Sequence, residues 1–376
     1  MRDARPIRRI LMTTDAVGGV WTHALDLTRG LTARGVRVDL AVLGPAPRPH
    51  HREEARSAGV RLLERPGRLE WMTDPWLDVE KNGAWLLDLD RRHRPDVIHL
   101  NGYCHGALRW HAPVLMAGHS CVRSWWRWVH GHEAPPEWDE YACRVRDGLL
   151  AVAMVVAPST AMLADLEVDY GPFAQVRVIP NGRAFTPVPG VAREPIVFAA
   201  GRLWDEAKNI EAVCAVAPSL GWPVMIAGDD RHPDGGHCVP GYVHHLGPLS
   251  ADAIAGWYAR ASIYVLPARY EPFGLTILEA ALSGCALVLG DIRSLRENWT
   301  GAALFVPPDN RPGLAHAIQG LIRDPARREE MARRARARAQ QFTVDRMVDG
   351  YLAAYRSIAA PVRDRRASER TRVAGR

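Results

Sequence analysis

The stretch Tyr270–Gly284, with the sequence YEPFGLTILEAALSG, decides the fold of this chain. It follows the apolar run Ile263–Pro267 and passes through a Phe-Gly-Leu turn into a segment with the apolar spacing of a helix. Two carboxylates, Glu271 and Glu279, flank the turn. A helix N-terminus favours a bound phosphate, and a carboxylate can accept two hydrogen bonds from neighbouring sugar hydroxyls. The pattern predicts a strand–loop–helix unit that binds a nucleotide-sugar.

The similarity to known sequences extends well beyond the two glutamates, from His245 to Asp309: HLGPLS, WYARASIYVLPARYEPFGLTILEA, GCALVLGD and FVPPDN. This run resembles the E-x7-E region of retaining glycosyltransferases with the GT-B fold, most closely glycosyltransferase family 4. The resemblance is strongest over Ile196–Asp309, fair over Ile10–Val42 and weak over Pro45–Pro113, where acceptor specificity should lie. It implies an α/β protein with two facing Rossmann-like, doubly wound domains and a cleft between them.

Short apolar runs with polar ends alternate with helical patterns along the chain, as in parallel sheets buried on both faces. A Pro-rich stretch after Ile179-Pro180-Asn181-Gly182 has the composition of a linker. The resemblance further implies that the last helix crosses back onto the first domain. We therefore expect an N-terminal acceptor-side domain (1–180), a linker (181–194), a C-terminal donor domain (195–342), a crossing helix (343–360) and a basic disordered tail (361–376).

Composition narrows the class of protein. The 376 residues contain no apolar run long enough to span a bilayer, and the six scattered cysteines lack C-x-x-C spacing. We expect reduced thiols, no metal site, no cofactor and a cytoplasmic location. Positive charge gathers in Arg323–Arg338 and Pro361–Arg376. A solvated helix face and a frayed tail are favoured, with contact to the anionic inner face of the membrane as the alternative; nucleic acid is not indicated.

Two further loops carry features suited to a diphosphate. Gly18 and Gly19 follow the first expected strand, where backbone N–H groups can approach an anion, although the G-x-G-x-x-G spacing is absent. By resemblance this loop reaches the donor. Arg202 and Lys208, in GRLWDEAKN, resemble the family's GRL…K element. Fixed cations there would stabilise the charge that grows on the leaving nucleoside diphosphate without a metal ion.

The resemblance also assigns roles around the glutamate pair. Glu279 would bind the ribose hydroxyls and Glu271 the hexose hydroxyls, and the backbone of the turn would complete the donor contact at Phe273, Gly274 and Leu275. No residue stands out as an activated nucleophile. Retention by front-face attack is therefore favoured over a covalent glycosyl-enzyme.

The first domain offers one histidine and one aromatic cluster. His119 ends an apolar run, and in many relatives a histidine here touches the transferred sugar; the alternative is a structural histidine. Trp125, Trp126 and Trp128 lie within SWWRWVH. Aromatic faces stack on sugars, so acceptor binding is one interpretation and an irregular packed loop is the other.

The chain is thus expected to be a retaining, metal-independent hexosyltransferase. It would use a nucleoside diphosphate sugar donor and a hydroxyl acceptor on a glycan, a lipid-linked glycan or a small metabolite. The expected catalytic residues are His119, Glu271, Arg202 and Lys208. A GT-B sugar-nucleotide epimerase and a catalytically silent binding scaffold remain as alternatives.

Overall fold

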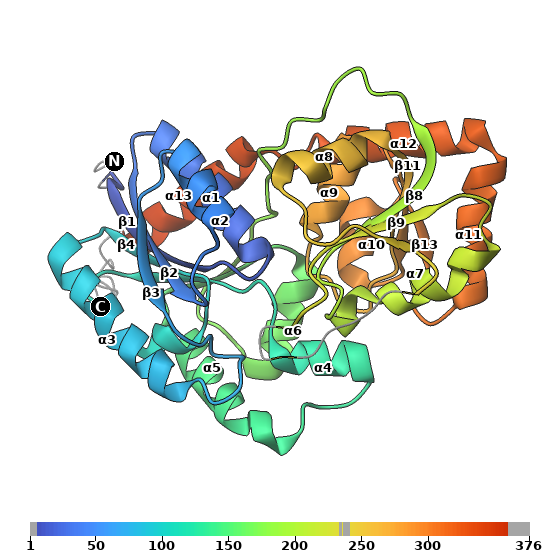
Figure 1. Ribbon diagram of the computed structural model, residues 1–376. Helices are drawn as coiled ribbons and strands as arrows, with labels where there is room; N and C mark the ends of the chain where they lie inside the picture. The colour runs from blue at the N-terminus through green and yellow to red at the C-terminus, as the bar shows by residue number, and fades with distance from the viewer. Residues whose placement is uncertain (1–5, 233–234, 236–240, 360–376) are drawn as a thin grey trace, which may run out of the picture.

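A computed structural model of the chain describes residues 6–232, 235 and 241–359. In this part of the chain, two lobes are each built around a parallel β-sheet (Figure 1). The strand order is β3-β2-β1-β4-β5-β6-β7 in the first sheet and β10-β9-β8-β11-β12-β13 in the second. The predicted α/β class with two Rossmann-like domains is confirmed.

The first sheet consists of β1 (Arg9–Asp15), β2 (Arg37–Gly44), β3 (Leu62–Pro66), β4 (Val97–Leu100), β5 (Val114–Ala117), β6 (Met154–Ala157) and β7 (Val176–Val178). Its lobe contains helices α1 (Gly19–Ala33), α2 (Pro49–Ser57), α3 (Trp76–His93), α4 (Val122–His130), α5 (Asp139–Ala151) and α6 (Thr160–Tyr170), with 3-10 turns η1 (Cys104–Ala107) and η2 (Pro136–Trp138).

The second sheet consists of β8 (Glu194–Ala200), β9 (Val224–Ala227), β10 (His244–His245), β11 (Ala261–Leu266), β12 (Ala286–Gly290) and β13 (Leu304–Val306). Its helices are α7 (Ile210–Val216), α8 (Ala251–Arg260), α9 (Leu275–Leu282), α10 (Arg293–Trp299), α11 (Arg311–Arg323) and α12 (Pro325–Ala339), with turns η3 (Glu206–Lys208) and η4 (Ala217–Ser219); α13 (Val344–Ala359) follows.

The central strands are uniformly apolar because helices cover both faces of each sheet. β6 and β11 are buried along their whole length. Each sheet separates two hydrophobic clusters, one on either face. In open parallel sheets of this kind, ligands bind beyond the carboxyl ends of the strands.

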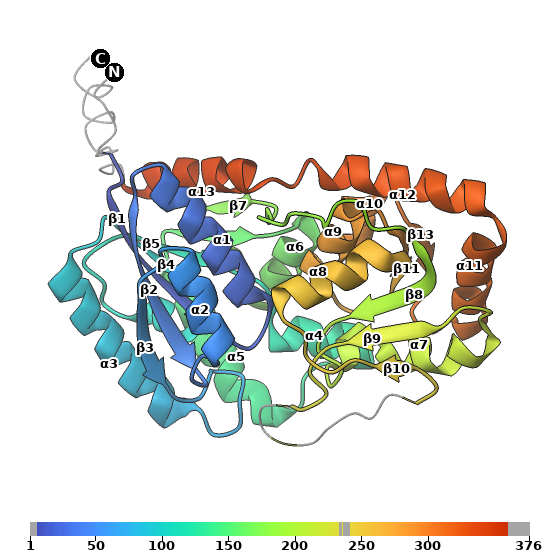
Figure 2. The ribbon, with the colours of Figure 1, turned by 45° about the horizontal axis from the view of Figure 1, so that its top comes forward.

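The last helix, α13, lies on the first lobe, although α12 before it covers the second (Figure 2). Met347, Val348 and Tyr351 join the hydrophobic cluster under β1 and α1. The contact is close because Gly30 of α1 has no side chain: a Cβ atom there would lie 2.5 Å from Cγ2 of Val348. The chain therefore connects the lobes twice, through the linker and through α13.

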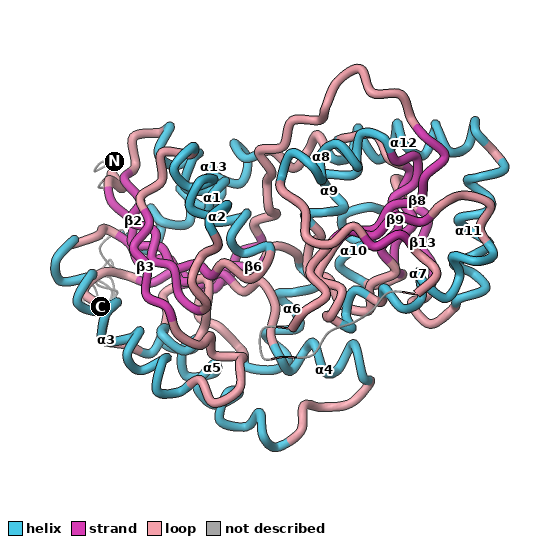
Figure 3. Tube along the Cα trace, viewed as in Figure 1, coloured by secondary structure: helices cyan, strands magenta, loops and turns pink. Residues whose placement is uncertain are grey.

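Short edge strands and one helix were not expected from the sequence. β3, β7, β10 and β13 are short and lie at or beside the sheet edges, where apolar patterning is weak. The tryptophan-rich stretch forms α4 and not the irregular loop that was one interpretation (Figure 3). Cys121 caps this helix by accepting a hydrogen bond from the backbone N–H of Ser124, and Gly131 ends it with φ 76°.

The basic stretch at α11 and α12 is partly used inside the fold. Arg328 and Arg338 donate to backbone carbonyls, and Arg333 and Arg334 pair with the carboxylate of Glu330. Of these contacts, only the pairs with Glu330 are exposed, as on a solvated helix face, and contact with an anionic membrane stays a prediction. The predicted tail, residues 361–376, lies outside the described residues. Within the described ranges, every helix is too short or too polar to cross a membrane.

Candidate active site

The β1–α1 loop of the first lobe meets the segment after β8 of the second. Asp15 accepts a hydrogen bond from the backbone N–H of Val17 at 2.9 Å, which turns the chain toward α1. A Cβ atom at Gly18 would lie 2.9 Å from NH1 of Arg202. Because α1 begins at Gly19, its unpaired N–H groups lie at this contact. The structure thus brings both glycines and Arg202 together.

Arg202 is held by a buried carboxylate. Its NH2 atom lies 2.6 Å from Oδ2 of Asp205, and its guanidinium lies over the ring of Trp204 at 5.1 Å. The Nε1 atom of Trp125 donates to Asp205 at 3.1 Å. Burial opposes ionisation of Asp205, but the charges of Arg202 and Lys208 lower its pKa overall. Asp205, which sequence analysis missed, thus links the predicted cation to α4 of the first lobe.

Lys208 and Glu271 are partners of each other. The Nζ atom of Lys208 lies 2.6 Å from Oε2 of Glu271, and each side chain is 13% exposed. The other carboxylate oxygen accepts from the backbone N–H of Phe273 at 3.3 Å. The pair holds both predicted side chains in fixed positions and leaves the lysine charge compensated.

Gly274 allows the sharp turn into α9. Its φ of 91° lies in the left-handed region, and a Cβ atom there would lie 2.6 Å from Cδ1 of Ile277. Leu275 is the first residue of α9, and its Cδ1 atom would lie 3.5 Å from a Cβ at Gly19. The turn of the second lobe therefore faces the glycine loop of the first.

Glu279 lies in an ion-pair network that sequence analysis did not predict. Its Oε1 atom accepts from Nε of Arg183 at 2.6 Å, while NH1 of Arg183 donates to Asp26 of α1 at 2.8 Å. Burial raises the pKa of Glu279 against the opposing charge of Arg183. The sequence feature that could have pointed to Arg183 is its position directly after Ile179-Pro180-Asn181-Gly182.

His119 lies beyond β5 at the carboxyl edge of the first sheet. Its Nε2 atom is 2.8 Å from Oδ1 of Asn101, and its ring centroid is 4.7 Å from that of buried His23. Burial lowers the pKa of His119 to about 4, so the imidazole is neutral at pH 7. A neutral ring can donate one hydrogen bond and accept another.

A cavity of about 760 Å³ lies between the lobes. Of the predicted residues, its lining includes Gly18, Gly19, His119, Trp125, Trp126 and Arg202. Lys208, Glu271, Phe273, Gly274, Leu275 and Glu279 lie outside this lining, on the second-lobe side of the cleft. The structure thus separates the predicted residues into a group around the cavity and a group around the α9 turn.

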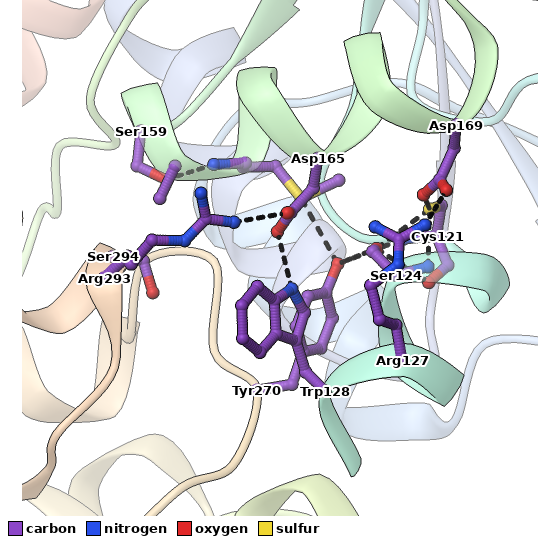
Figure 4. A network of polar contacts seen from close by, with 12 residues as sticks. Cys121, Ser124, Arg127, Trp128, Ser159, Asp165, Asp169, Tyr270, Arg293 and Ser294 are labelled. Atoms are coloured by element: carbon purple, nitrogen blue, oxygen red, sulfur yellow. Dashed lines mark hydrogen bonds and ion pairs between the residues drawn. The ribbon is translucent and has the colours of Figure 1, made fainter. Parts of the chain in front are cut away.

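Trp128 belongs to a contact between the lobes and lies outside the cavity lining. Its Nε1 atom donates to Asp165 of α6 at 3.1 Å, and the guanidinium of Arg293 lies over its ring at 4.9 Å (Figure 4). In the same network, the hydroxyls of Tyr270 and Ser124 are 2.9 Å apart. Of the three predicted acceptor residues, two face the cavity and one joins the lobes.

Each lobe matches the model of a known protein family. The model of "Glycosyltransferase Family 4" matches residues 17–183, and that of "Glycosyl transferases group 1" matches residues 194–324. The chain is a glycosyltransferase of family 4. The two matches are separated by residues 184–193 of the linker, and together they contain each predicted site residue.

Relatives and solved structures agree with this assignment. The family 4 chain is 29% identical to a glycogen synthase of Mycobacterium tuberculosis over 88% of its length and 87% of that protein. It is 25% identical to a D-inositol 3-phosphate glycosyltransferase of Xylanimonas cellulosilytica, over 91% and 92%. Anabaena HepE in complex with UDP and glucose shares the fold, with a TM-score of 0.73, 17% identity and coverage of 93% and 100%. The GT-B fold of this family 4 glycosyltransferase is confirmed.

Proposed function

We propose that this enzyme transfers a hexose from a nucleoside diphosphate sugar to a hydroxyl group, with retention of the anomeric configuration and without a metal ion. The main support is the contact between Gly18, next to the start of α1, and Arg202 of the second lobe. It joins backbone N–H donors and a guanidinium at one point of the cleft, and a diphosphate is bound well by both.

The other predicted residues extend this donor site across the second lobe. Lys208 would share the diphosphate charge with Arg202, Glu271 would bind the hexose hydroxyls, and Glu279 would bind the ribose. The Lys208–Glu271 pair favours this assignment, because one contact at 2.6 Å orients a cation for the diphosphate and a carboxylate that can accept hydrogen bonds from sugar hydroxyls. The HepE complex makes UDP the first nucleotide to test.

The chemistry we propose is front-face substitution. The bond between the anomeric carbon and the diphosphate oxygen breaks while the acceptor oxygen bonds to the same face of the sugar. The acceptor proton passes to the departing diphosphate oxygen. Arg202 and Lys208 stabilise the charge that develops on that leaving group, which lowers the barrier more than it strengthens ground-state binding.

His119 would position the transferred sugar. Its neutral ring donates from Nε2 to Oδ1 of Asn101 at 2.8 Å, so Nδ1 carries a lone pair that can accept a hydrogen bond from a sugar hydroxyl. A protonated ring would add positive charge beside an anomeric carbon that itself becomes positive. The lowered pKa of His119, about 4, avoids that repulsion at pH 7.

Nucleotide-dependent thermal stability tests the donor site directly. The native chain, Glu279→Ala and the surface control Glu329→Ala are each heated with UDP, GDP or ADP. A nucleotide at a hundred times its Kd adds about 2.7 kcal/mol, which raises Tm by a few degrees. We expect one nucleotide to stabilise the native chain and the control but not Glu279→Ala. Absence of any shift in the native chain would contradict a nucleotide-sugar enzyme.

Product analysis separates transfer from the two alternatives. With the identified donor, a transferase releases nucleoside diphosphate faster when acceptor is present and forms a glycoside with the donor's anomeric configuration. An epimerase changes the donor sugar without acceptor. A silent scaffold binds the nucleotide and changes neither compound.

A further inference from the structure

The cavity between the lobes is rich in tryptophan, although a guanidinium lies over the ring of Trp204 and another over that of Trp76. Of the chain's 13 tryptophans, six line this one cavity, and each keeps part of its surface accessible: Trp71, Trp76, Trp125, Trp126, Trp138 and Trp204. They come from both lobes and from several elements, so sequence spacing alone does not group them. Partly open indole faces stack on the apolar faces of sugar rings and attract cations.

The charged groups of the same lining are mostly acidic. Six carboxylates contribute: Asp15, Glu70, Asp74, Glu137, Asp205 and Glu206. The two guanidinium groups of the lining, Arg68 and Arg202, already have partners: Arg68 donates to the carbonyl of Thr73, and Arg202 pairs with Asp205. Arg202 lies beside Gly18 with its charge compensated by Asp205, whereas Arg68 keeps its charge next to Thr73, the residue before Asp74. The six carboxylates still outnumber the two guanidinium groups, so the lining is acidic overall.

Two carboxylates of the lining, Asp74 and Glu137, stand close to tryptophans in the sequence and far from Gly18 and Arg202. Asp74 precedes α3 two residues before Trp76, and Glu137 precedes Trp138 in η2. Both acidic residues are exposed, so their charges face solvent. We call this exposed part of the lining, at Asp74 and Glu137, the rim; a ligand there would meet both charges. Glu70 is already committed, because its oxygens accept from the backbone N–H groups of Tyr103 and Cys104 at 2.9 Å each.

We propose that the acceptor subsite binds a phosphate-free cyclic polyol, and that an amino substituent on the ring strengthens binding. The inference rests on the proposed transfer to a hydroxyl acceptor and specifies its chemical class. Indole faces bind the ring, the carboxylates accept hydrogen bonds from hydroxyls, and an ammonium group is attracted by both. A phosphate on the acceptor would be repelled by the carboxylates at the rim.

Tryptophan fluorescence with three disaccharides of one skeleton tests this proposal. The probes are cellobiose, the β-1,4-linked glucosamine disaccharide and cellobiose 6'-phosphate, each titrated with UDP present. We expect the amine to bind roughly three- to tenfold more tightly than cellobiose, and the phosphate to bind most weakly. The proposal is overturned if the phosphate binds most tightly, or if none of the three probes changes the fluorescence.

A charge-neutral variant tests whether Asp74 and Glu137 cause the preference for the amine. Asp74→Asn/Glu137→Gln keeps the side-chain shapes and should abolish most of the preference for the amine over cellobiose. The control, Glu167→Gln/Glu329→Gln, removes two exposed charges on α6 and α12, outside the cavity lining. Stabilisation by nucleotide should survive in both variants. An unchanged amine preference in the first variant would contradict the role of the rim, whereas loss of the nucleotide shift in the native chain would contradict the donor site instead.

Discussion

The Nε atom of Arg183 lies 2.6 Å from Oε1 of Glu279, the residue assigned to the donor ribose. The same guanidinium donates to Asp26 at 2.8 Å, and Asp26 also accepts from the backbone N–H of Ala184 at 3.1 Å. Since Arg183 stands between the lobes, it connects α9 of the second lobe to α1 of the first. The position of the carboxylate that we propose binds the ribose therefore depends on how the lobes are joined.

Removing this guanidinium should destabilise the chain strongly. In Arg183→Gln, the carboxylates of Glu279 and Asp26 would lie buried near each other without a cation. We expect the free energy of unfolding to fall by about 3–5 kcal/mol, measured by urea denaturation. Arg311→Gln, which breaks an exposed pair with Glu211, should cost less than about 1 kcal/mol. Similar losses in both variants would show that Arg183 acts as a surface residue.

Lys208 should contribute to catalysis more than to substrate binding. In Lys208→Met, kcat should fall roughly a hundredfold or more, with a smaller change in the KM for donor, because the charge on the leaving diphosphate grows toward the transition state. The matched control is Lys81→Met, which removes an exposed lysine of α3. Steady-state kinetics of the native chain and both variants give kcat and the KM for donor. A rise in donor KM at constant kcat would assign Lys208 to ground-state binding alone.

Much of the architecture is predictable because buried parallel strands are short, continuous apolar runs. The cores of β1, β6, β11 and β12 all follow such runs. The two glycine loops that we propose bind the donor are also predictable, since Gly18 and Gly274 stand at strand–helix junctions where the backbone must turn closely. These signals are local, and local signals can be read from a sequence.

The contacts between the lobes could not be predicted in this way. Arg183 finds Asp26 at a separation of 157 residues and Glu279 at 96. Trp126 and Trp128 stand two residues apart in α4, yet Trp126 lines the cavity and Trp128 points to Asp165 of α6 and to Arg293 (Figure 4). Which tryptophan faces the cavity depends on the direction of α4 and on the position of the second lobe, and neither is encoded in the spacing of the aromatic residues.

Stability should decrease as the pH falls through the range in which ordinary histidines are protonated. Burial lowers the pKa of His119 to about 4 and that of His99 to about 3, from an ordinary value of 6.5. Between pH 6.5 and about 4, the unfolded chain therefore binds protons that the folded chain does not. This contribution to stability is complete above pH 6.5 and is lost progressively below it.

Urea midpoints at pH 7.5, 6 and 5 measure this dependence. His119→Gln should flatten the pH dependence, because it removes one of the groups that protonate only on unfolding. His316→Gln, an exposed histidine of α11, is the control and should leave the slope as in the native chain. Identical slopes in all three proteins would mean that His119 is protonated equally in the folded and unfolded states.

Chelation should leave transfer unchanged. Arg202 and Lys208 are proposed to supply the positive charge that a divalent cation would otherwise bring to the diphosphate. We expect activity with EDTA to stay within about twofold of the untreated rate, a difference of less than 0.5 kcal/mol in the barrier. A large loss that added Mg²⁺ or Mn²⁺ restores would show that the two cations are insufficient and that the diphosphate binds with a metal ion.

Trp126 and Trp128 should differ in function although they stand two residues apart. Trp126 lines the cavity, whereas Trp128 bonds to Asp165 and lies under Arg293. Trp126→Ala should raise the acceptor KM roughly three- to tenfold through lost stacking, with donor binding unchanged. Trp128→Ala should instead lower Tm and leave the acceptor KM nearly constant. The acceptor KM and the Tm are measured for both variants. Equal effects on acceptor KM would show that the two tryptophans do not have separate roles.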